Sequence, residues 1–415
     1  MHGQHPHWTM DSPIRSPRTL AILAVTQLVS WGMLYYAFAI VAPDIGHTLG
    51  MRAELVFGAF SWALLVAGLA AAPVGILIDR YGGRLPMAFG SLLCGVGFIL
   101  LSGAQGAVAY FAAWTVLGLS MSGVLYEAAF ATLNVRFGAD ARRAISTLTL
   151  FGGFASTVFW PLTLKLNTLL GWRDTYFWYG LLQLMLCLPL HLLLTPPAPR
   201  DRQARHKRES GDFNLAQALR HPAFWTLAFA FSANSFIFSA LSVHLIPILQ
   251  GYGHPVATVV LMAALIGPMQ VAGRLAEMTV ARSIHPATIG KICFAIMPAA
   301  LLALLFFGRQ QWAMALFCVF YGLANGILTI VRGTVPQLLF GARNYGAISG
   351  ALAGPSLLAK AAGPLAVAAV IQVNNSPALL FGMLLVFSLA SLIFFTLAVR
   401  AEGSAPSLPS TAKST

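Results

Sequence analysis

Long apolar segments dominate this chain of 415 residues. An α-helix rises about 1.5 Å per residue, so roughly 20 apolar residues cross the hydrocarbon core of a bilayer. Only 9% of the residues are charged, whereas soluble domains carry about 25%. Twelve segments meet the length requirement, at about 19–43, 53–77, 86–104, 107–135, 143–166, 173–195, 221–249, 256–280, 288–307, 311–338, 345–372 and 377–399. The sequence therefore predicts an all-α integral membrane protein with twelve transmembrane helices.

One hydrophilic break divides these segments into six and six. It reads TPPAPRDRQARHKRESGDFNLAQALRH, and its prolines and mixed charges are typical of a linker. The sequence thus predicts a six-helix bundle at 19–195, a cytoplasmic linker at 196–220 and a second six-helix bundle at 221–399. Cytoplasmic tails at 1–18 and 400–415 flank the two bundles.

The two bundles contain an internal repeat at a constant offset of 203 residues. Four pairs share this offset: RFGAD at 136–140 with LFGAR at 339–343, AIS at 144–146 with AIS at 347–349, Pro161 with Pro364, and Gly123 with Gly326. Such repeats are typical of transporters whose halves are related by an axis along the membrane normal. In these proteins the substrate site lies near the midplane, between the halves.

The positive charge of the chain is distributed unevenly. The 25 Lys and Arg residues outnumber the 12 Asp and Glu residues, which would suggest nucleic-acid binding in a soluble protein. Membrane proteins instead keep Lys and Arg in cytoplasmic loops. With both termini in the cytoplasm, 18 of the 25 fall in inner loops and tails, and only four in outer loops. This predicts a multi-pass protein of the plasma membrane, the inner membrane in a bacterium, without a nucleic-acid partner.

One motif lies between the second and third segments. GILIDRYGGR at 75–84 resembles the G-x-L-x-D-R-x-G-x-[RK] signature of the major facilitator superfamily. Gly75 permits close helix packing, and Gly82 permits a tight turn. We expect Asp79, with Arg80 and Arg84, at the cytoplasmic mouth. The resemblance implies a fold of two pseudo-symmetric six-helix bundles.

The resemblance also implies a latch on the cytoplasmic side. Asp79 would pair with Arg136 and face the positive N-terminus of the segment at 345–372, and this contact would break when the carrier opens inward. The other interpretation of the motif is a solvated charged turn. At the 203-residue offset the second half has Arg282 in place of the aspartate and lacks the paired glycines. We therefore expect only a degenerate latch there.

Three of the 25 cations lie inside predicted helices: Arg274, Arg332 and Lys360. A charge at the centre of a membrane helix costs about 2.5 kcal/mol or more, so each one needs a partner or a function. A bound anion between Arg274 and Lys360 would relieve their repulsion and replace their lost hydration. The fork of an Arg suits a carboxylate, and a Lys adds a point charge. Alternatively, Arg274 and Glu277 neutralise each other at i, i+3 spacing.

The same residues carry a second, narrower resemblance. SWGMLYY at 30–36, GR at 273–274 and AK at 359–360 are similar to features of the oxalate:formate antiporters and related monocarboxylate carriers. This resemblance implies that Arg274 and Lys360 bind a carboxylate. It also implies that Tyr35 or Tyr36 lines the opposite wall of the site.

Glu127, Arg332 and His244 are candidate site residues outside that pattern. Arg332 corresponds to Ala129 in the repeat, within one helical turn of Glu127, so the two could pair across the halves as a structural clamp or a gate. Glu127 is also a candidate proton carrier, because burial favours the protonated form of a carboxyl group. His244 is either a proton relay or a histidine bonded to a backbone carbonyl.

Three classes of function fit these observations. The first is a secondary transporter working by alternating access on a small organic anion, as a monomer, with a proton or a counter-anion as coupling partner and lipid around it. The second is an efflux carrier for a toxic compound such as a metalloid or a drug, because four cysteines lie in apolar segments. The third is a non-transporting membrane receptor.

No Walker loop, HExxH or usable GxSxG motif indicates an enzyme, and we expect no cofactor and no metal. The tail histidines His2, His5 and His7 could bind a metal, but we favour the interpretation of a short tail with chance histidines.

Overall fold

A computed structural model describes residues 17–195, 212–374 and 376–400, and these residues form helices and short connections without β-strands. The predictions for the tail residues 1–16 and 401–415 and for linker residues 196–211 lie outside the described part. The first half contains α1 (Pro17–Trp31), the π-helical turn η1 (Gly32–Tyr36), α2 (Ala37–Leu49), α3 (Ala53–Tyr81), α4 (Arg84–Ser102), α5 (Ala107–Val124), α6 (Tyr126–Phe137), α7 (Ala141–Gly153), α8 (Ala155–Leu182), η3 (Gln183–Cys187) and α9 (Leu188–Leu192).

The second half begins after the linker and contains seven further long or medium-length helices among the described residues. They are α12 (Pro222–Gln250), α13 (Val256–Ala263), α14 (Ile266–Thr279), α15 (Pro286–Phe307), α16 (Gln311–Phe340), α17 (Tyr345–Val373) and α18 (Pro377–Arg400). The turns η2 (Gly138–Asp140) and η4 (Ala281–Ser283) precede α7 and α15.

Eleven helical stretches of the described chain are long and apolar enough to cross a membrane. One of them, Ala141–Leu192, has 52 residues and would extend about 78 Å at 1.5 Å per residue, against about 30 Å of hydrocarbon. The chain reverses within this stretch at Gly171, where φ is 80°. It therefore counts as two crossings, and the twelve-helix fold predicted from the sequence is confirmed.

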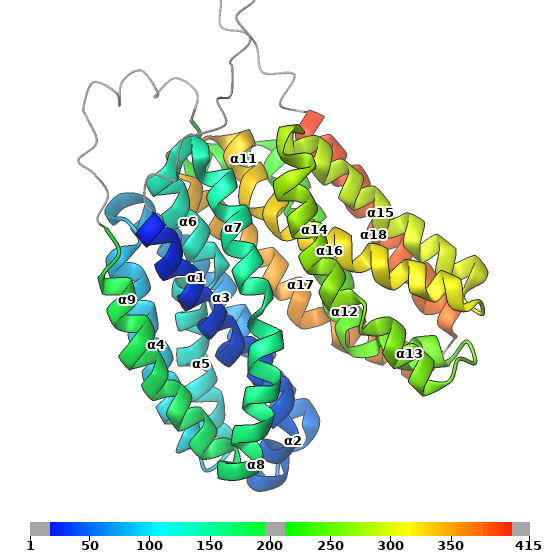
Figure 1. Ribbon diagram of the computed structural model, residues 1–415, viewed down its shortest axis with the longest axis horizontal. Helices are drawn as coiled ribbons and strands as arrows, with labels where there is room; N and C mark the ends of the chain where they lie inside the picture. The colour runs from blue at the N-terminus through cyan, green and yellow to red at the C-terminus, as the bar shows by residue number, and fades with distance from the viewer. Residues whose placement is uncertain (1–16, 196–211, 375, 401–415) are drawn as a thin grey trace, which may run out of the picture.

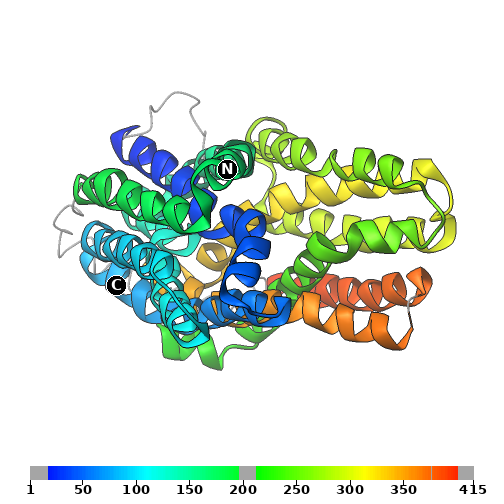
Figure 2. The ribbon, with the colours of Figure 1, turned by 90° about the horizontal axis from the view of Figure 1, so that it is seen from below.

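The two halves lie side by side and meet mainly near one end. Figure 1 shows α11 and the described ends of the linker at the top, where the halves converge, and the halves diverging towards the bottom. We call the top the linker end. Figure 2, viewed from the opposite end, shows the blue-to-green half beside the green-to-red half. Between the halves, α3 packs on α17, and α7 packs on α14 and α16.

The internal repeat is visible in the backbone. Gly138 and Gly341, 203 residues apart, both end a helix at positive φ, 55° and 87°. Only glycine adopts such a conformation without strain. The repeat is broken at Leu125, where an extended residue separates α5 from α6, whereas α16 continues through the corresponding region. The first half therefore has a discontinuous helix that the second half lacks.

The end of the linker is more ordered than its composition predicts. Residues 215–220 form a short helix, α11 (Leu215–Arg220), which starts with a capping box between Asn214 and Gln217. The backbone N–H of Phe213 donates to the carbonyl of Phe340, and Asn344 donates to the carbonyl of Phe213. These bonds attach the linker to the ends of α16 and α17.

Candidate functional site

A cavity of about 150 Å³ lies between the two halves. The first half contributes an aromatic wall and one carboxylate, and the second half contributes cations and amides. The polar and aromatic lining residues include Trp31, Tyr35, Tyr36, Tyr126, Glu127, Asn234, Ser235, Gln270, Arg274, Asn325, Arg332 and Lys360. All three intramembrane cations singled out in the sequence thus line one cavity, together with a single carboxylate among the described lining residues.

Arg274 projects from α14 towards the first half. Its side chain is only 5% exposed, and its Nε is a buried donor with no hydrogen-bond partner among the described residues. Gly153, at the end of α7, leaves space for the guanidinium, because a Cβ there would overlap it. The expected pairing with Glu277 is not formed within the described chain. Arg274 therefore remains available to a ligand.

Lys360 lies in α17 where one backbone hydrogen bond of the helix is missing. Pro364 lacks the N–H that would bond the carbonyl of Lys360 in a regular helix, and Ser239 of α12 donates to that carbonyl instead, at 2.6 Å. The ammonium nitrogen of Lys360 lies 4.1 Å from the ring centroid of Tyr35 and 5.6 Å from that of Trp31. These are cation–π contacts across the halves.

The aromatic wall depends on a local widening of the first transmembrane helix. In η1 the N–H of Ala37 bonds the carbonyl of Gly32, five residues earlier, which is a π-helical turn of the kind often found at functional sites. The consecutive residues Tyr35 and Tyr36 both line the cavity. Trp31 links them to the other tyrosine of the wall, with centroid distances of 5.5 Å to Tyr35 and 4.9 Å to Tyr126.

Glu127 lies in the first turn of α6, directly after the break at Leu125. The buried side chain of Gln27 donates to the carbonyl of Val124, at the end of α5, and so stabilises the break. Glu127 itself has no hydrogen bond and no ion pair within 4 Å among the described residues. Its predicted pairing with Arg332 is therefore absent in this conformation.

Arg332 is held by its own half. It donates to Ser235 of α12 at 2.5 Å, and its guanidinium carbon lies 5.7 Å from the ring centroid of Phe231. Glu127, Arg332 and Lys360 all line the same cavity, so one negative charge from the first half faces two positive charges from the second half. Glu127 and the two cations therefore form an electrostatic network without direct contact.

His244 is not among the described residues that line the cavity. Its Nε2 lies 2.9 Å from the carbonyl of Pro364, a geometry in which the ring donates to α17. Of the two interpretations considered from the sequence, this contact matches the backbone-bonded histidine. It joins α12 to α17 at Pro364.

The signature motif contacts the second half at the linker end. The two carboxylate oxygens of Asp79 accept from the backbone N–H groups of Gly346 and Ala347, at 2.9 and 2.8 Å, in the first turn of α17. Anionic groups are stabilised there because these N–H groups have no partner within the helix. Gly75 lets the helices approach, since a Cβ on Gly75 would overlap the carbonyl of Gly346. Gly82 turns the chain at φ 79°.

The cations of the motif have other surroundings. Arg80 and Arg84 are exposed, and Arg80 lies 5.3 Å from the ring centroid of its neighbour Tyr81. Arg136 is half-buried near the end of α6. Of the two contacts expected of Asp79, the hydrogen bonds of Asp79 to the helix-end amides of α17 are present among the described residues.

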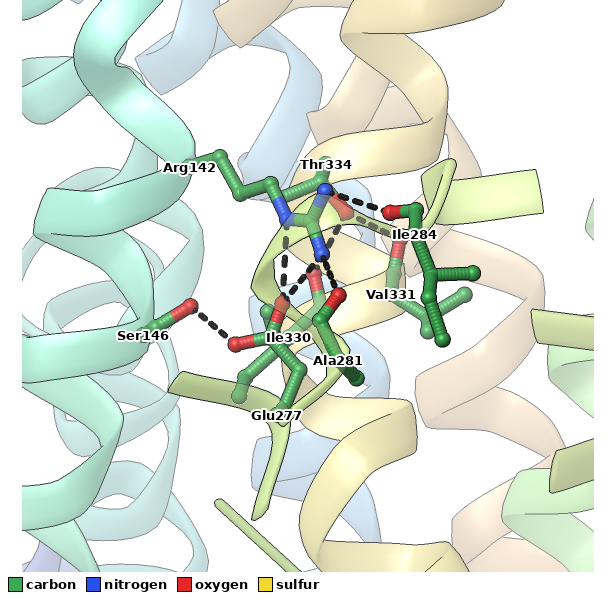
Figure 3. Close-up of polar contacts among 8 residues, drawn as sticks. All are labelled: Arg142, Ser146, Glu277, Ala281, Ile284, Ile330, Val331 and Thr334. Carbon is green, nitrogen blue, oxygen red and sulfur yellow. Dashed lines mark hydrogen bonds and ion pairs between the residues drawn. The ribbon is translucent and has the colours of Figure 1, made fainter. Parts of the chain in front are cut away.

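A second contact closes the other side of the interface (Figure 3). Glu277 of α14 accepts two hydrogen bonds from Arg142 of α7, at 2.8 and 3.0 Å, and one from Ser146 at 2.7 Å. Arg142 also donates to the carbonyls of Ala281 and Ile284. The aspartate of the motif is absent from the second half, in keeping with a degenerate motif there. A glutamate from a neighbouring position instead joins α14 to α7, the helices that correspond to α3 and α17 in the repeat.

Comparisons with known proteins agree with this architecture. The family model of the Major Facilitator Superfamily matches residues 20–364. The chain belongs to the major facilitator superfamily. A curated relative within it is the oxalate:formate antiporter of Oxalobacter formigenes, 25% identical over 216 residues. That match spans about half of each protein, 52% of this chain and 51% of the antiporter.

Two solved transporters share the superfamily fold. The human organic anion transporter MFSD10 superposes with a TM-score of 0.69 at 16% identity, covering 92% of this chain and all of that protein. The E. coli fucose:proton symporter FucP superposes with a TM-score of 0.68 at 11% identity, covering 91% and 98% of the two chains. At these identities the likeness concerns the fold alone.

Some site residues escaped the sequence analysis. The lining amides Asn234, Gln270 and Asn325 lie in apolar helices, where uncharged polar residues are common and carry no distinctive pattern. Arg142 was counted as a loop cation and Glu277 as the neighbour of Arg274. The repeat could have indicated both residues. At the 203-residue offset, Asp79 corresponds to a position close to Glu277, and the start of α17 corresponds to Arg142.

Proposed function

We propose that this carrier is a secondary transporter of small organic anions, in particular carboxylates, and works by alternating access. The observation that carries the proposal is the charge of the cavity lining. Three cations from the second half face one carboxylate from the first half, which leaves a formal charge of +2. Such a site favours a dianion or a pair of monoanions, because an unbalanced buried charge is costly.

Arg274 and Lys360 are the proposed ligands of the carboxylates. Arg274 has a buried donor without a partner, and Lys360 is held against Tyr35 by a cation–π contact that leaves its hydrogen-bonding protons available. Tyr35 and Tyr36 form the facing wall. Glu127 would repel a carboxylate, so we do not include it among the ligands.

We further propose that the structure represents the state closed towards the cytoplasm. The Asp79 and Glu277 contacts both join the halves at the linker end, and the positive-inside distribution of Lys and Arg places that end in the cytoplasm of a plasma membrane. Opening these two contacts, while the halves close at the other end, would expose the bound anion to the cytoplasm. The protein would function as a monomer.

The alternative of metalloid efflux has less support. Cys94, Cys187, Cys293 and Cys318 are all buried, and none of them is among the described residues that line the cavity. A thiol-dependent metalloid site would need at least one of them there. A cationic drug would be repelled by the same lining that suits a carboxylate.

The test is ligand-dependent thermal stabilisation of the purified protein across mono- and dicarboxylates. We expect at least one acid to raise the melting temperature of the wild type, Lys360→Met to abolish the effect, and Arg274→Lys to weaken it because the bidentate fork is lost. The double variant should behave like Lys360→Met alone, since both cations hold one ligand. Lys165→Met, at an exposed position outside the cavity, is the control. Equal stabilisation of wild type and Lys360→Met would remove the lysine from the site.

A further inference from the structure

Glu127 is the feature of the cavity that a carboxylate site does not require. It is the single carboxylate among the described lining residues, and it makes no hydrogen bond or ion pair among them. A like charge beside the substrate weakens binding, so its presence needs a separate explanation. The break at Leu125 places it at the N-terminus of α6, where the helix dipole stabilises a negative charge.

The electrostatic partners of Glu127 belong to the opposite half. Arg332 of α16 and Lys360 of α17 line the same cavity as Glu127, whereas Glu127 itself belongs to α6. Both cations also have partial compensation from neutral groups: Ser235 and Phe231 for Arg332, and two aromatic rings for Lys360. Arg274 is the cation with a free buried donor. In the absence of a ligand, the positive charges of Arg332 and Lys360 are thus partly compensated by protein groups.

This arrangement bears on the return step of the transport cycle. To change its orientation without substrate, the carrier must exclude water from the cavity, and uncompensated cations then oppose closure. A site with cations alone would close only around a bound anion, which restricts the carrier to exchange. A fixed carboxylate on the opposite wall lowers the charge of the empty cavity from +3 to +2 and draws the halves together.

We propose that Glu127 is an internal counter-anion, which takes the place of part of the substrate's charge in the empty carrier and so permits net transport of the acid in addition to exchange. The inference rests on the proposed function, since it presumes an anionic substrate. It assigns to Glu127 an effect on the return step, which is separate from substrate binding.

The experiment uses the full-length protein in liposomes, with radiolabelled oxalate and, separately, radiolabelled succinate. Exchange is measured with the same acid on both sides, and net efflux is measured into acid-free buffer with the membrane potential clamped. For Glu127→Gln we expect net efflux to fall about tenfold relative to exchange, and the KM of exchange to fall several-fold because a competing charge is gone. Glu127→Asp should restore net efflux.

Two further variants keep the result interpretable. Arg332→Gln removes a cation from the same network and should have the opposite effect, a higher KM with a ratio of net efflux to exchange at or above that of wild type. Glu54→Gln removes an exposed carboxylate far from the cavity and should leave both rates unchanged. Melting temperatures of all variants, measured without ligand, separate misfolding from a change in transport.

Several results would overturn the inference. One is an unchanged ratio of net efflux to exchange in Glu127→Gln. A second is loss of exchange together with net efflux in folded Glu127→Gln, which would make Glu127 part of the substrate site. A third is proton movement that accompanies wild-type net efflux and vanishes in Glu127→Gln, which would make Glu127 a proton carrier. If the wild type exchanges neither acid, the proposed function itself fails, a result distinguishable from the other three.

Discussion

Arg142 and Glu277 are 135 residues apart in the chain, and their side chains meet at 2.8 Å across the interface of the two halves. Glu277 is 3% exposed and Arg142 is 25% exposed, so the pair is largely shielded from water. It lies at the same end of the molecule as the contact of Asp79 with α17. The two contacts together hold both sides of the interface.

Replacing Glu277 by Gln should weaken closure at the linker end. Hydrogen bonds to charged groups contribute about 1.5–3 kcal/mol each, so we expect the equilibrium between the two orientations to shift by roughly 10-fold or more. The measurement is labelling of a cysteine introduced at Thr149, a buried residue one turn beyond Ser146 on α7, in a form that lacks the native cysteines. Glu54→Gln, which breaks the exposed pair with Arg52 at the other end, is the matched control and should not change labelling.

Replacing Asp79 by Asn should slow turnover while leaving the protein folded. Gly346 and Ala347 donate to different oxygens of Asp79, and in Asn one of these oxygens is replaced by an NH2 group, which is a donor and cannot accept. We expect substrate-dependent thermal stabilisation to persist and the transport rate to fall about tenfold. Wild-type transport rates in this variant would mean that the motif forms only a turn.

Replacing Gly75 by Ala should disturb the same interface through packing. The added Cβ would overlap the carbonyl of Gly346, so α3 and α17 must separate. We expect lower thermal stability and greater labelling at the linker end. Gly382→Ala in α18, where a Cβ meets no atom within 4 Å, should behave as wild type. Similar behaviour of the two variants would contradict the close packing.

Replacing Tyr35 by Leu should weaken anion binding by releasing Lys360. Cation–π contacts contribute about 0.5–2 kcal/mol, which corresponds to roughly 2- to 30-fold in affinity. Tyr35→Phe keeps the ring and should retain most of the affinity. Titration of each variant with the best-stabilising acid distinguishes the two effects, and equal losses in both would assign the role to the hydroxyl group.

Single cysteines at Ala216 and Gln310 should label from opposite sides of the membrane. Both positions are exposed, one in α11 and the other just before α16, whereas the four native cysteines are buried. We expect Ala216→Cys to react only from the cytoplasm and Gln310→Cys only from outside. Labelling of both from one side would contradict the twelve-helix topology.

The sequence by itself determined the twelve apolar spans, the repeat and the three intramembrane cations. These features depend on local composition and on spacing along one helix, which a sequence displays directly. For the same reason Arg274 and Lys360 could be assigned to helices, whereas their prediction as ligands of one site also used the resemblance to the carboxylate carriers.

Only the tertiary structure decided the partners of these charges. Glu277 lies one turn from Arg274 yet bonds to Arg142, because packing of α14 on α7 brings a distant guanidinium closer than the neighbouring one. The break at Leu125 and the wide turn at Gly32 likewise depend on buried partners such as Gln27 and Phe159, which only long-range packing supplies. A side chain in a membrane has few polar groups within reach, so the fold, rather than distance along the chain, selects which one it meets.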